Sequence, residues 1–175
     1  MKKSSIYIMR RAISAAVFAL SVIMFATSLC TQVKAQQTNN GPLAEMWTAY
    51  NEKQWATAIA KAADYINENG DQAAKMQDKL LKKKEPVPEP EEIPEADRAR
   101  FFARGILNDV ATCYFYQGEA YVNLKQMDKA KKAYEEAAKL TYALTWDTNG
   151  WFWSPSGKAK ERLASTRLFP PSSNK

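Results

Sequence analysis

The chain has 175 residues, 46% of them apolar, which fits one folded domain with a short tail. It contains no histidine and only two cysteines, which excludes Ser-His-Asp triads, Cys-His dyads, histidine-ligated metals and four-cysteine zinc sites. The net charge is +6, but five bases and no acids lie in residues 1–35. The remainder is nearly neutral, so the basic balance does not indicate a nucleic-acid-binding protein.

Residues 1–35 have the pattern of an export signal. Basic residues lie up to Arg11, an uncharged apolar stretch follows from Ala12 to Val33, and Val33-Lys34-Ala35 places small residues where signal peptidase requires them. We therefore expect cleavage after Ala35 and a periplasmic or secreted mature protein. The apolar run AISAAVFALSVIMFATSL just reaches membrane-spanning length, so an uncleaved N-terminal membrane anchor is the alternative.

The first half of the mature chain predicts three helices and a loop. Residues 36–42 are polar and predict a flexible tail. A helix begins at Pro42 and Leu43, a second runs from about Trp55 to Asn69-Gly70, where glycine is the usual stop, and a third, polar helix covers 71–84. Residues 85–94 contain four prolines, which break helices and sheets, and predict an extended acidic loop. Its acids are expected to balance the basic run at 79–84.

The second half is also predicted to be helical. A helix resumes at Glu95 and continues to Asn123 with a weak point at Gly105, and another follows from Met127 to Leu144. Residues 145–155 predict an aromatic loop, 156–167 a short capping helix after Ser154-Pro155, and 169–175 a tail. No stretch of the mature chain shows sustained period-2 alternation, so the predicted class is all-α.

One motif carries more information than composition. The pattern Tyr114-x-x-Gln117-Gly118-x-x-Tyr121 is followed by Ala130-x-x-x-Tyr134-x-x-Ala137. It resembles the tetratricopeptide repeat, in which small residues let two antiparallel helices approach closely and aromatic residues fill the space beside them. The resemblance implies a helix-turn-helix unit over residues 111–144. Gln117 and Tyr142 depart from the usual leucine and proline, and the latter predicts a longer second helix.

A weaker echo of this unit lies upstream. Ala49-Tyr50, Lys53-Gln54-Trp55 and Ala58 parallel Ala120-Tyr121, Lys125-Gln126-Met127 and Ala130, with one residue fewer in the turn. We interpret 43–69 as a degenerate first repeat and 71–94 as an insertion. Residues 43–168 are then a single tetratricopeptide-like α-solenoid with capping helices, which close the ends that two repeats leave open.

The resemblance implies that a peptide or protein binds in a concave groove lined by the first helix of each repeat. In this chain the groove would be lined by Thr112, Phe115, Tyr116, Glu119, Val122 and Asn123. Alternatively, Phe115 and Tyr116 pack internally. A second candidate is the aromatic cluster of Trp146, Trp151 and Trp153, because sugar-binding surfaces combine planar rings with polar groups. Aromatic clusters at a domain end also serve as core.

No feature predicts catalysis. The paired glutamates lie in polar settings, and Asp109 is expected to form an ion pair or a cap. Cys113, the only cysteine after signal removal, is expected to be a small buried residue. We therefore predict a non-enzymatic adaptor for a protein or peptide partner in the cell envelope, with a carbohydrate-binding module as the alternative. No cofactor, metal or nucleic acid is expected, and a membrane only if the N-terminal segment is uncleaved.

Overall fold

The computed structural model describes residues 42–90, 93–146 and 151–170. The predicted export segment 1–35 lies outside the described residues. All described residues belong to one compact unit, Asn39–Lys175, which we call the second unit of the chain because residues 1–38 precede it. Every hydrophobic core cluster described below lies within this second unit.

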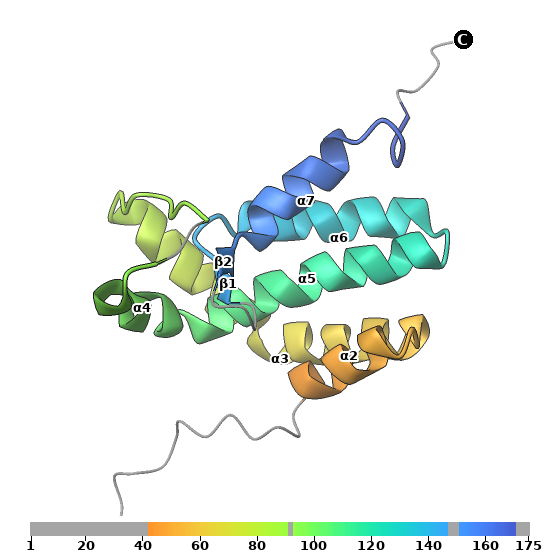
Figure 1. The fold of residues 1–175 in the computed structure, drawn as a ribbon, viewed down its shortest axis with the longest axis horizontal. Helices are drawn as coiled ribbons and strands as arrows, with labels where there is room; N and C mark the ends of the chain where they lie inside the picture. The colour runs from red at the N-terminus through yellow and green to blue at the C-terminus, as the bar shows by residue number, and fades with distance from the viewer. Residues whose placement is uncertain (1–41, 91–92, 147–150, 171–175) are drawn as a thin grey trace, which may run out of the picture. The chain divides into compact units, whose positions relative to one another are not determined.

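The described residues form an all-α fold, as predicted. The helices are α2 (Pro42–Asn51), α3 (Trp55–Lys82), α4 (Glu95–Phe102), α5 (Gly105–Asn123), α6 (Met127–Lys139) and α7 (Pro155–Ala164) (Figure 1). The predicted aromatic loop contains two short antiparallel strands, β1 (Thr145–Trp146) and β2 (Phe152–Trp153), which pair Thr145 with Trp153 and Trp146 with Phe152. Ser154 caps α7 as predicted, because its hydroxyl accepts a hydrogen bond from the Gly157 amide.

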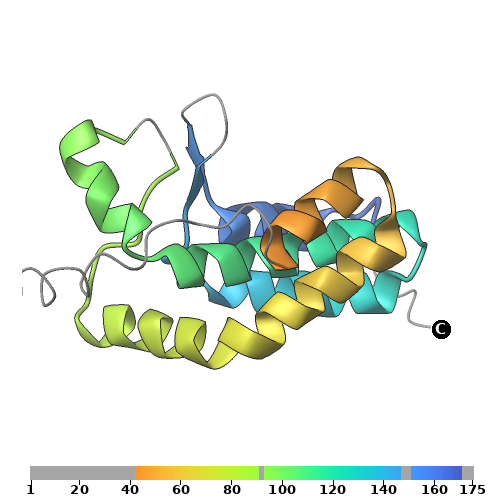
Figure 2. The ribbon, with the colours of Figure 1, turned by 90° about the horizontal axis from the view of Figure 1, so that it is seen from below.

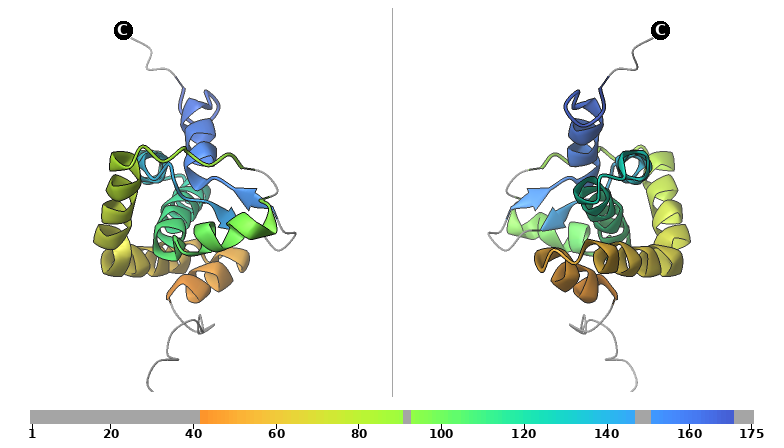
Figure 3. Two further views of the ribbon diagram at one scale, coloured as in Figure 1. Left: turned by 90° about the vertical axis from the view of Figure 1, so that its left-hand side faces the viewer. Right: turned by 90° about the vertical axis from the view of Figure 1, so that its right-hand side faces the viewer.

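Helix α5 is the centre of the fold. It packs against α3 and α6 and also contacts α2 and α7, while α2 packs against α3 and α7 against α6. In Figure 1, α2, α5 and α7 lie one above the other, from bottom to top, on the side facing the viewer. Figures 2 and 3 show α4 and the hairpin on one side of α5 and α3 on the other.

The turns that join α2 to α3 and α5 to α6 have the same geometry. Lys53 and Lys125 both adopt positive φ, at 60° and 57°. The next amides, of Gln54 and Gln126, donate to carbonyls five residues earlier, at 2.8 and 2.9 Å. This is the Schellman motif, which satisfies the last carbonyls of a helix. The turns are therefore equally long, and the prediction of one residue fewer in the first turn is wrong.

The predicted close approach within the α5–α6 pair is present at Gly118. A Cβ atom at this position would lie 2.6 Å from Cε1 of Tyr134, well inside van der Waals contact. Tyr134 is fully buried against Phe115, and Ala130 and Ala137 are buried in the same cluster. Glycine at 118 thus leaves the space that the Tyr134 ring fills.

Three predicted helix boundaries are corrected by the structure. Helix α3 continues through Gly70, because Tyr65 and Ile66 before it and Ala73 after it pack in one core cluster, and this burial exceeds the roughly 1 kcal/mol cost of a helical glycine. The helix predicted from Glu95 to Asn123 is divided at Ala103 and Arg104 into α4 and α5.

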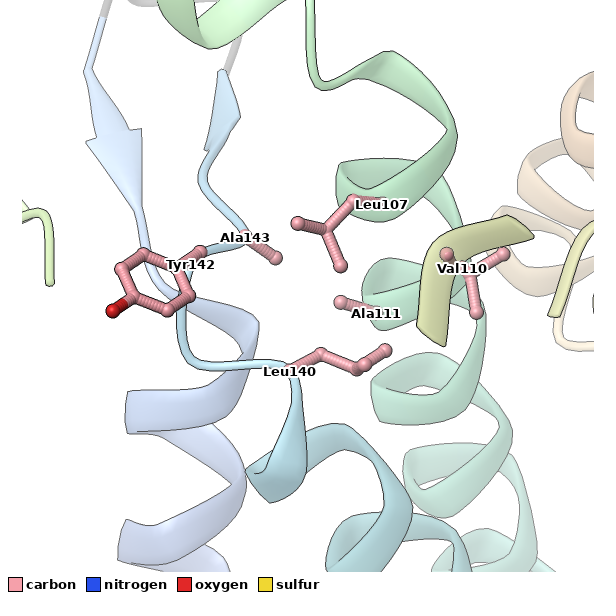
Figure 4. Close-up of a cluster of buried hydrophobic side chains, with 7 residues drawn as sticks. Leu107, Val110, Ala111, Leu140, Tyr142 and Ala143 are labelled. Atoms are coloured by element: carbon pink, nitrogen blue, oxygen red, sulfur yellow. The ribbon is translucent and has the colours of Figure 1, made fainter. Parts of the chain in front are cut away.

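The third correction concerns α6, which ends at Lys139 and not at Leu144. Residues 140–144 turn back into the largest core cluster (Figure 4), whose labelled members are Leu107, Val110, Ala111, Leu140, Tyr142 and Ala143. Buried amide side chains replace the lost helical hydrogen bonds: Asn108 Oδ1 accepts from the Leu144 amide at 3.1 Å, and Gln77 Oε1 accepts from the Tyr142 amide at 3.2 Å.

The acidic loop after α3 is attached to the junction of α4 and α5. Glu85 pairs with the buried guanidinium of Arg104 at 3.2 Å and with Arg100 at 3.7 Å, and the Tyr142 hydroxyl donates to the Glu85 carbonyl. Within the described residues, no loop acid pairs with a lysine of the 79–84 run. The described acids of the loop therefore do not form the predicted ion pairs with this basic run. Glu91 and Glu92 of the loop lie outside the described residues.

Candidate functional site

Four half-buried aromatic side chains from three elements meet beside α5. We call this set, Trp47 and Tyr50 of α2, Tyr116 of α5 and Trp153 of β2, the aromatic face. Tyr116 is its centre, with ring centroids 4.5 Å from Trp47, 4.6 Å from Tyr50 and 6.1 Å from Trp153. All three contacts are edge-to-face, the arrangement that aromatic quadrupoles favour.

The helical spacing of the sequence explains how these rings meet. Trp47 and Tyr50 are three residues apart, so they lie on one side of α2. Tyr116 lies next to Phe115, which is buried against Tyr134 and Trp153 and holds this part of α5 on the hairpin. The aromatic face is thus supported from beneath by the core.

An acidic group adjoins the aromatic face. Glu119 lies one turn after Tyr116, and its carboxylate accepts hydrogen bonds from the Tyr134 hydroxyl at 2.6 Å and from Arg162 of α7 at 2.6 and 3.1 Å. The Glu119 side chain retains 17% of its exposure. The bidentate pair with Arg162 fastens α7 to α5, and it leaves the carboxylate at the edge of the ring cluster.

The tyrosines of the aromatic face stay neutral over the physiological range. Burial and the nearby Glu119 carboxylate raise the pKa of Tyr50 to about 12, although the Arg162 guanidinium acts in the opposite direction. The same two causes raise the pKa of Tyr116. Neither hydroxyl forms a hydrogen bond within the described part of the chain. Every fully buried side-chain nitrogen or oxygen atom of that part has a hydrogen-bond partner, so these two hydroxyl oxygens are not fully buried. These hydroxyls are therefore accessible donors.

The predicted groove residues do not all lie on an accessible surface. Thr112 is buried and bonds to the Asn108 carbonyl and the Thr145 hydroxyl. Phe115 is buried in the core, which agrees with the alternative that it packs internally. Val122 is partly buried against the same core cluster. Asn123 is exposed and donates to the Glu119 carbonyl at 2.9 Å.

Tyr116 and Glu119 are the predicted groove residues that adjoin the aromatic face. The structure also brings Trp153, from the second predicted site, to Tyr116, which joins parts of the two sites that the sequence kept apart. Trp47, Tyr50 and Arg162 were not among the predicted site residues. The three-residue spacing of Trp47 and Tyr50 was the available signal, whereas nothing in the sequence indicates that Arg162 meets Glu119.

The other predicted aromatic residues form a separate surface at the hairpin. Trp146 is 50% exposed and meets the edge of Phe102, which is 51% exposed, at a centroid distance of 6.1 Å. Trp151, next to β2, is 55% exposed. We call Phe102, Trp146 and Trp151 the hairpin tip. Single exposed aromatics are ordinary, but the exposed and contacting rings of Phe102 and Trp146 form a candidate contact surface.

Asp109 and Cys113 lie in surroundings that are typical of buried residues in a helical core. Asp109 accepts a hydrogen bond from the Tyr65 hydroxyl at 3.0 Å and does not form the predicted ion pair within the described residues. Burial raises the pKa of the Asp109 carboxyl. Cys113 is fully buried as predicted, and burial raises the pKa of its thiol far above its ordinary value, which keeps it protonated.

Among the described residues, no group of three or more acids or cysteines is arranged to hold a metal ion. None of the helices in the described ranges has the length and apolarity needed to span a membrane. Comparisons with protein-family models, curated proteins and solved structures find no match for this chain.

Proposed function

We propose that this protein is a non-enzymatic, exported adaptor of the tetratricopeptide type that binds a peptide or protein segment on the aromatic face. The observation that carries the proposal is the meeting of Trp47, Tyr50 and Trp153 on Tyr116, beside the Glu119 carboxylate. Tyrosine and tryptophan dominate binding energy at protein interfaces because they bury large areas with few rotatable bonds.

The chemistry of the face fits a peptide. Half-buried rings offer apolar area while the Tyr50 and Tyr116 hydroxyls can donate to backbone carbonyls of a bound segment. Because the rings pack on one another and on a buried Phe115, they lose little conformational freedom on binding. The export pattern of residues 1–35 supports a partner in the cell envelope.

The proposal is tested by crosslinking and pulldown of the tagged mature protein from its own envelope fraction, with mass spectrometry. The variant Tyr50→Phe/Tyr116→Phe keeps both rings and removes both hydroxyls, so it should weaken binding of a stoichiometric partner by about tenfold or more. Tyr114→Phe is the matched control, because Tyr114 is a half-buried tyrosine of α5 outside the aromatic face. Equal binding by both variants would contradict the assignment of this face.

A second candidate is favoured by the exposure of the hairpin tip. Trp146, Trp151 and Phe102 present half-exposed rings that suit stacking on a sugar ring, as in a carbohydrate-binding module. Affinity electrophoresis in polysaccharide gels tests it. A glycan binder should lose its retardation on Trp146→Ala and keep it on Tyr50→Phe/Tyr116→Phe, whereas the adaptor should show no retardation in any form.

A further inference from the structure

The end of α3 carries a dense cluster of lysines. Three of them are spaced four and three residues apart along α3, which places them on one stripe of the helix, and two more follow at the turn after it. The cluster, which we call the lysine face, consists of Lys75, Lys79, Lys82, Lys83 and Lys84. All five side chains are exposed. The first four line a shallow, open hollow together with Asp78.

Some cations of the described chain pair with acids, whereas the lysines of this face do not, and neither do the exposed lysines of α6 at 129, 131 and 132. Lys61 pairs with Glu45, Lys158 with Glu161 and Arg162 with Glu119. Within the described residues, no ion pair involves a lysine of the lysine face. Glu85, the acid that follows Lys84, faces Arg104 and Arg100 instead. Among the described residues, Asp78 is the acid that lines the hollow with these lysines, so the described part of this face carries a positive excess.

Helix stability alone does not account for this arrangement. Lysines in the last turn interact favourably with the helix dipole, which explains Lys79 and Lys82. Lys75 lies further from the end, and the pairs Lys75–Lys79 and Lys79–Lys83 place like charges four residues apart, where they destabilise a helix. A concentration of charge with an unfavourable local effect indicates an external anionic partner.

The lysine face is bordered by exposed apolar side chains. Leu81 precedes Lys82–Lys84 and is 51% exposed, and Val87 follows them and is 52% exposed. Basic residues next to exposed aliphatic ones are the combination that binds the surface of an anionic bilayer, since headgroup phosphates attract the ammonium groups and short apolar side chains enter the interface. A soluble acidic partner would leave Leu81 and Val87 without a role.

We infer that the lysine face is a docking surface for an anionic phospholipid bilayer. Figures 2 and 3 place α3 and the hairpin on opposite sides of α5, so the protein can rest on a membrane through α3 while other surfaces stay accessible. This contact adds to any membrane attachment by an uncleaved N-terminal segment. It does not depend on the proposed function, since no residue of the aromatic face takes part.

The test uses the chain from Gln36, the predicted mature form, because it lacks the apolar N-terminal segment and contains the compact unit Asn39–Lys175 with all its core clusters. Binding is measured by flotation with vesicles of equal parts phosphatidylglycerol and phosphatidylcholine, and with phosphatidylcholine alone. We expect binding to the anionic vesicles only, and its loss at about 1 M salt, where the screening length is about 3 Å.

The variant Lys75→Gln/Lys79→Gln/Lys83→Gln should bind the anionic vesicles about 100-fold more weakly, since each lysine near the surface contributes about fivefold. The control is Lys129→Gln/Lys131→Gln/Lys132→Gln, which removes the same charge from exposed positions of α6 and should bind within about threefold of the unchanged chain. Far-ultraviolet circular dichroism checks that both variants keep their helices. Leu81→Asn/Val87→Asn should weaken binding about tenfold at constant charge.

Several results would overturn the inference. Equal loss in the two lysine variants would show a general charge effect, and unchanged binding by the α3 variant would remove the lysine face from the contact. Full binding by Leu81→Asn/Val87→Asn, combined with displacement from vesicles by inorganic phosphate, would indicate a site for soluble anions and not a bilayer surface.

Discussion

The helix pairs α2–α3 and α5–α6 share one turn but fill their interiors in opposite ways. Counting from Lys53 and Lys125, Met46 occupies the position of Gly118, and Ala62 occupies the position of Tyr134. In the first pair the large side chain lies on the first helix and the small one on the second; in the second pair the order is reversed. The same turn geometry is therefore compatible with two packing arrangements, provided that a large residue on one helix faces a small residue on the other.

The largest effect should come from removing the large residue of the first pair. Met46 is fully buried with Ala62 and Cys113, so Met46→Ala leaves a cavity and should lower the free energy of unfolding by about 3 kcal/mol. Urea denaturation followed by tryptophan fluorescence measures it. A loss below about 1 kcal/mol would show that α2 packs too loosely to hold the aromatic face.

The second pair should be sensitive to the reverse change. Gly118→Ala places a Cβ atom 2.6 Å from the Tyr134 ring, and Tyr134 is held by buried contacts and by its hydrogen bond to Glu119. We expect a loss of about 2 kcal/mol despite alanine's better helix propensity.

Gly70→Ala is the control for Gly118→Ala. The added Cβ at 70 would meet only Ile66, at an ordinary 3.7 Å, so this change should stabilise the fold by up to about 1 kcal/mol. Thermal denaturation of both variants decides the matter, and equal effects of the two alanines would refute the close approach at Gly118.

The boundary between the pairs contains a titrating group, the Asp109 carboxyl on α5 beside Tyr65 of α3. Burial raises its pKa above the ordinary 3.8, so the native state holds this proton more tightly than the unfolded state does. Stability is therefore lost as pH rises through the raised pKa.

Asp109→Asn removes this titration and keeps an oxygen to accept the Tyr65 hydroxyl hydrogen bond. The variant should be more stable than the unchanged chain at neutral pH, and the advantage should shrink towards zero as pH falls below 3.8. Urea denaturation at the two pH values measures this difference. A pH-independent difference would indicate that the packing, and not the charge, has changed.

The smallest effect should appear where the pairs are alike. Lys53 and Lys125 adopt positive φ, which glycine adopts more easily, so Lys53→Gly and Lys125→Gly should each stabilise the protein by about 0.5 kcal/mol. Similar shifts in thermal melts would confirm the equivalence of the turns, whereas opposite signs would contradict it.

The difference between glycines 70 and 118 also shows how far the sequence could be interpreted. Both glycines lie within or next to helical patterns of the sequence. The motif around Gly118 correctly predicted a close approach, because the partner Tyr134 lies within the same local unit. Gly70 was predicted to end a helix, but its neighbours Tyr65, Ile66 and Ala73 pack against distant residues of α5 that no local pattern reveals.

The candidate site was predictable only in part. Tyr116 and Glu119 were named from the motif, and Trp153 from its aromatic neighbours. The meeting of Tyr116 with Trp47 and Tyr50 depends on how α2 docks on α5, and these two contacts join residues more than sixty positions apart. The contact of Tyr116 with Trp153 depends in turn on how the hairpin docks on α5. Thr112 and Phe115 are buried and do not lie on the surface, and both contact the hairpin.

The sequence by itself determined the all-α class, the start of most helices and the Ser154 cap of α7, because apolar periodicity, proline and capping side chains act within a few residues of chain. Tertiary structure alone decided that α3 continues past Gly70, that α6 ends at Lys139, and that one tryptophan of the hairpin supports the core while two stay exposed. These outcomes depend on burial between elements far apart in the chain, and burial energy exceeds local propensity wherever the two disagree.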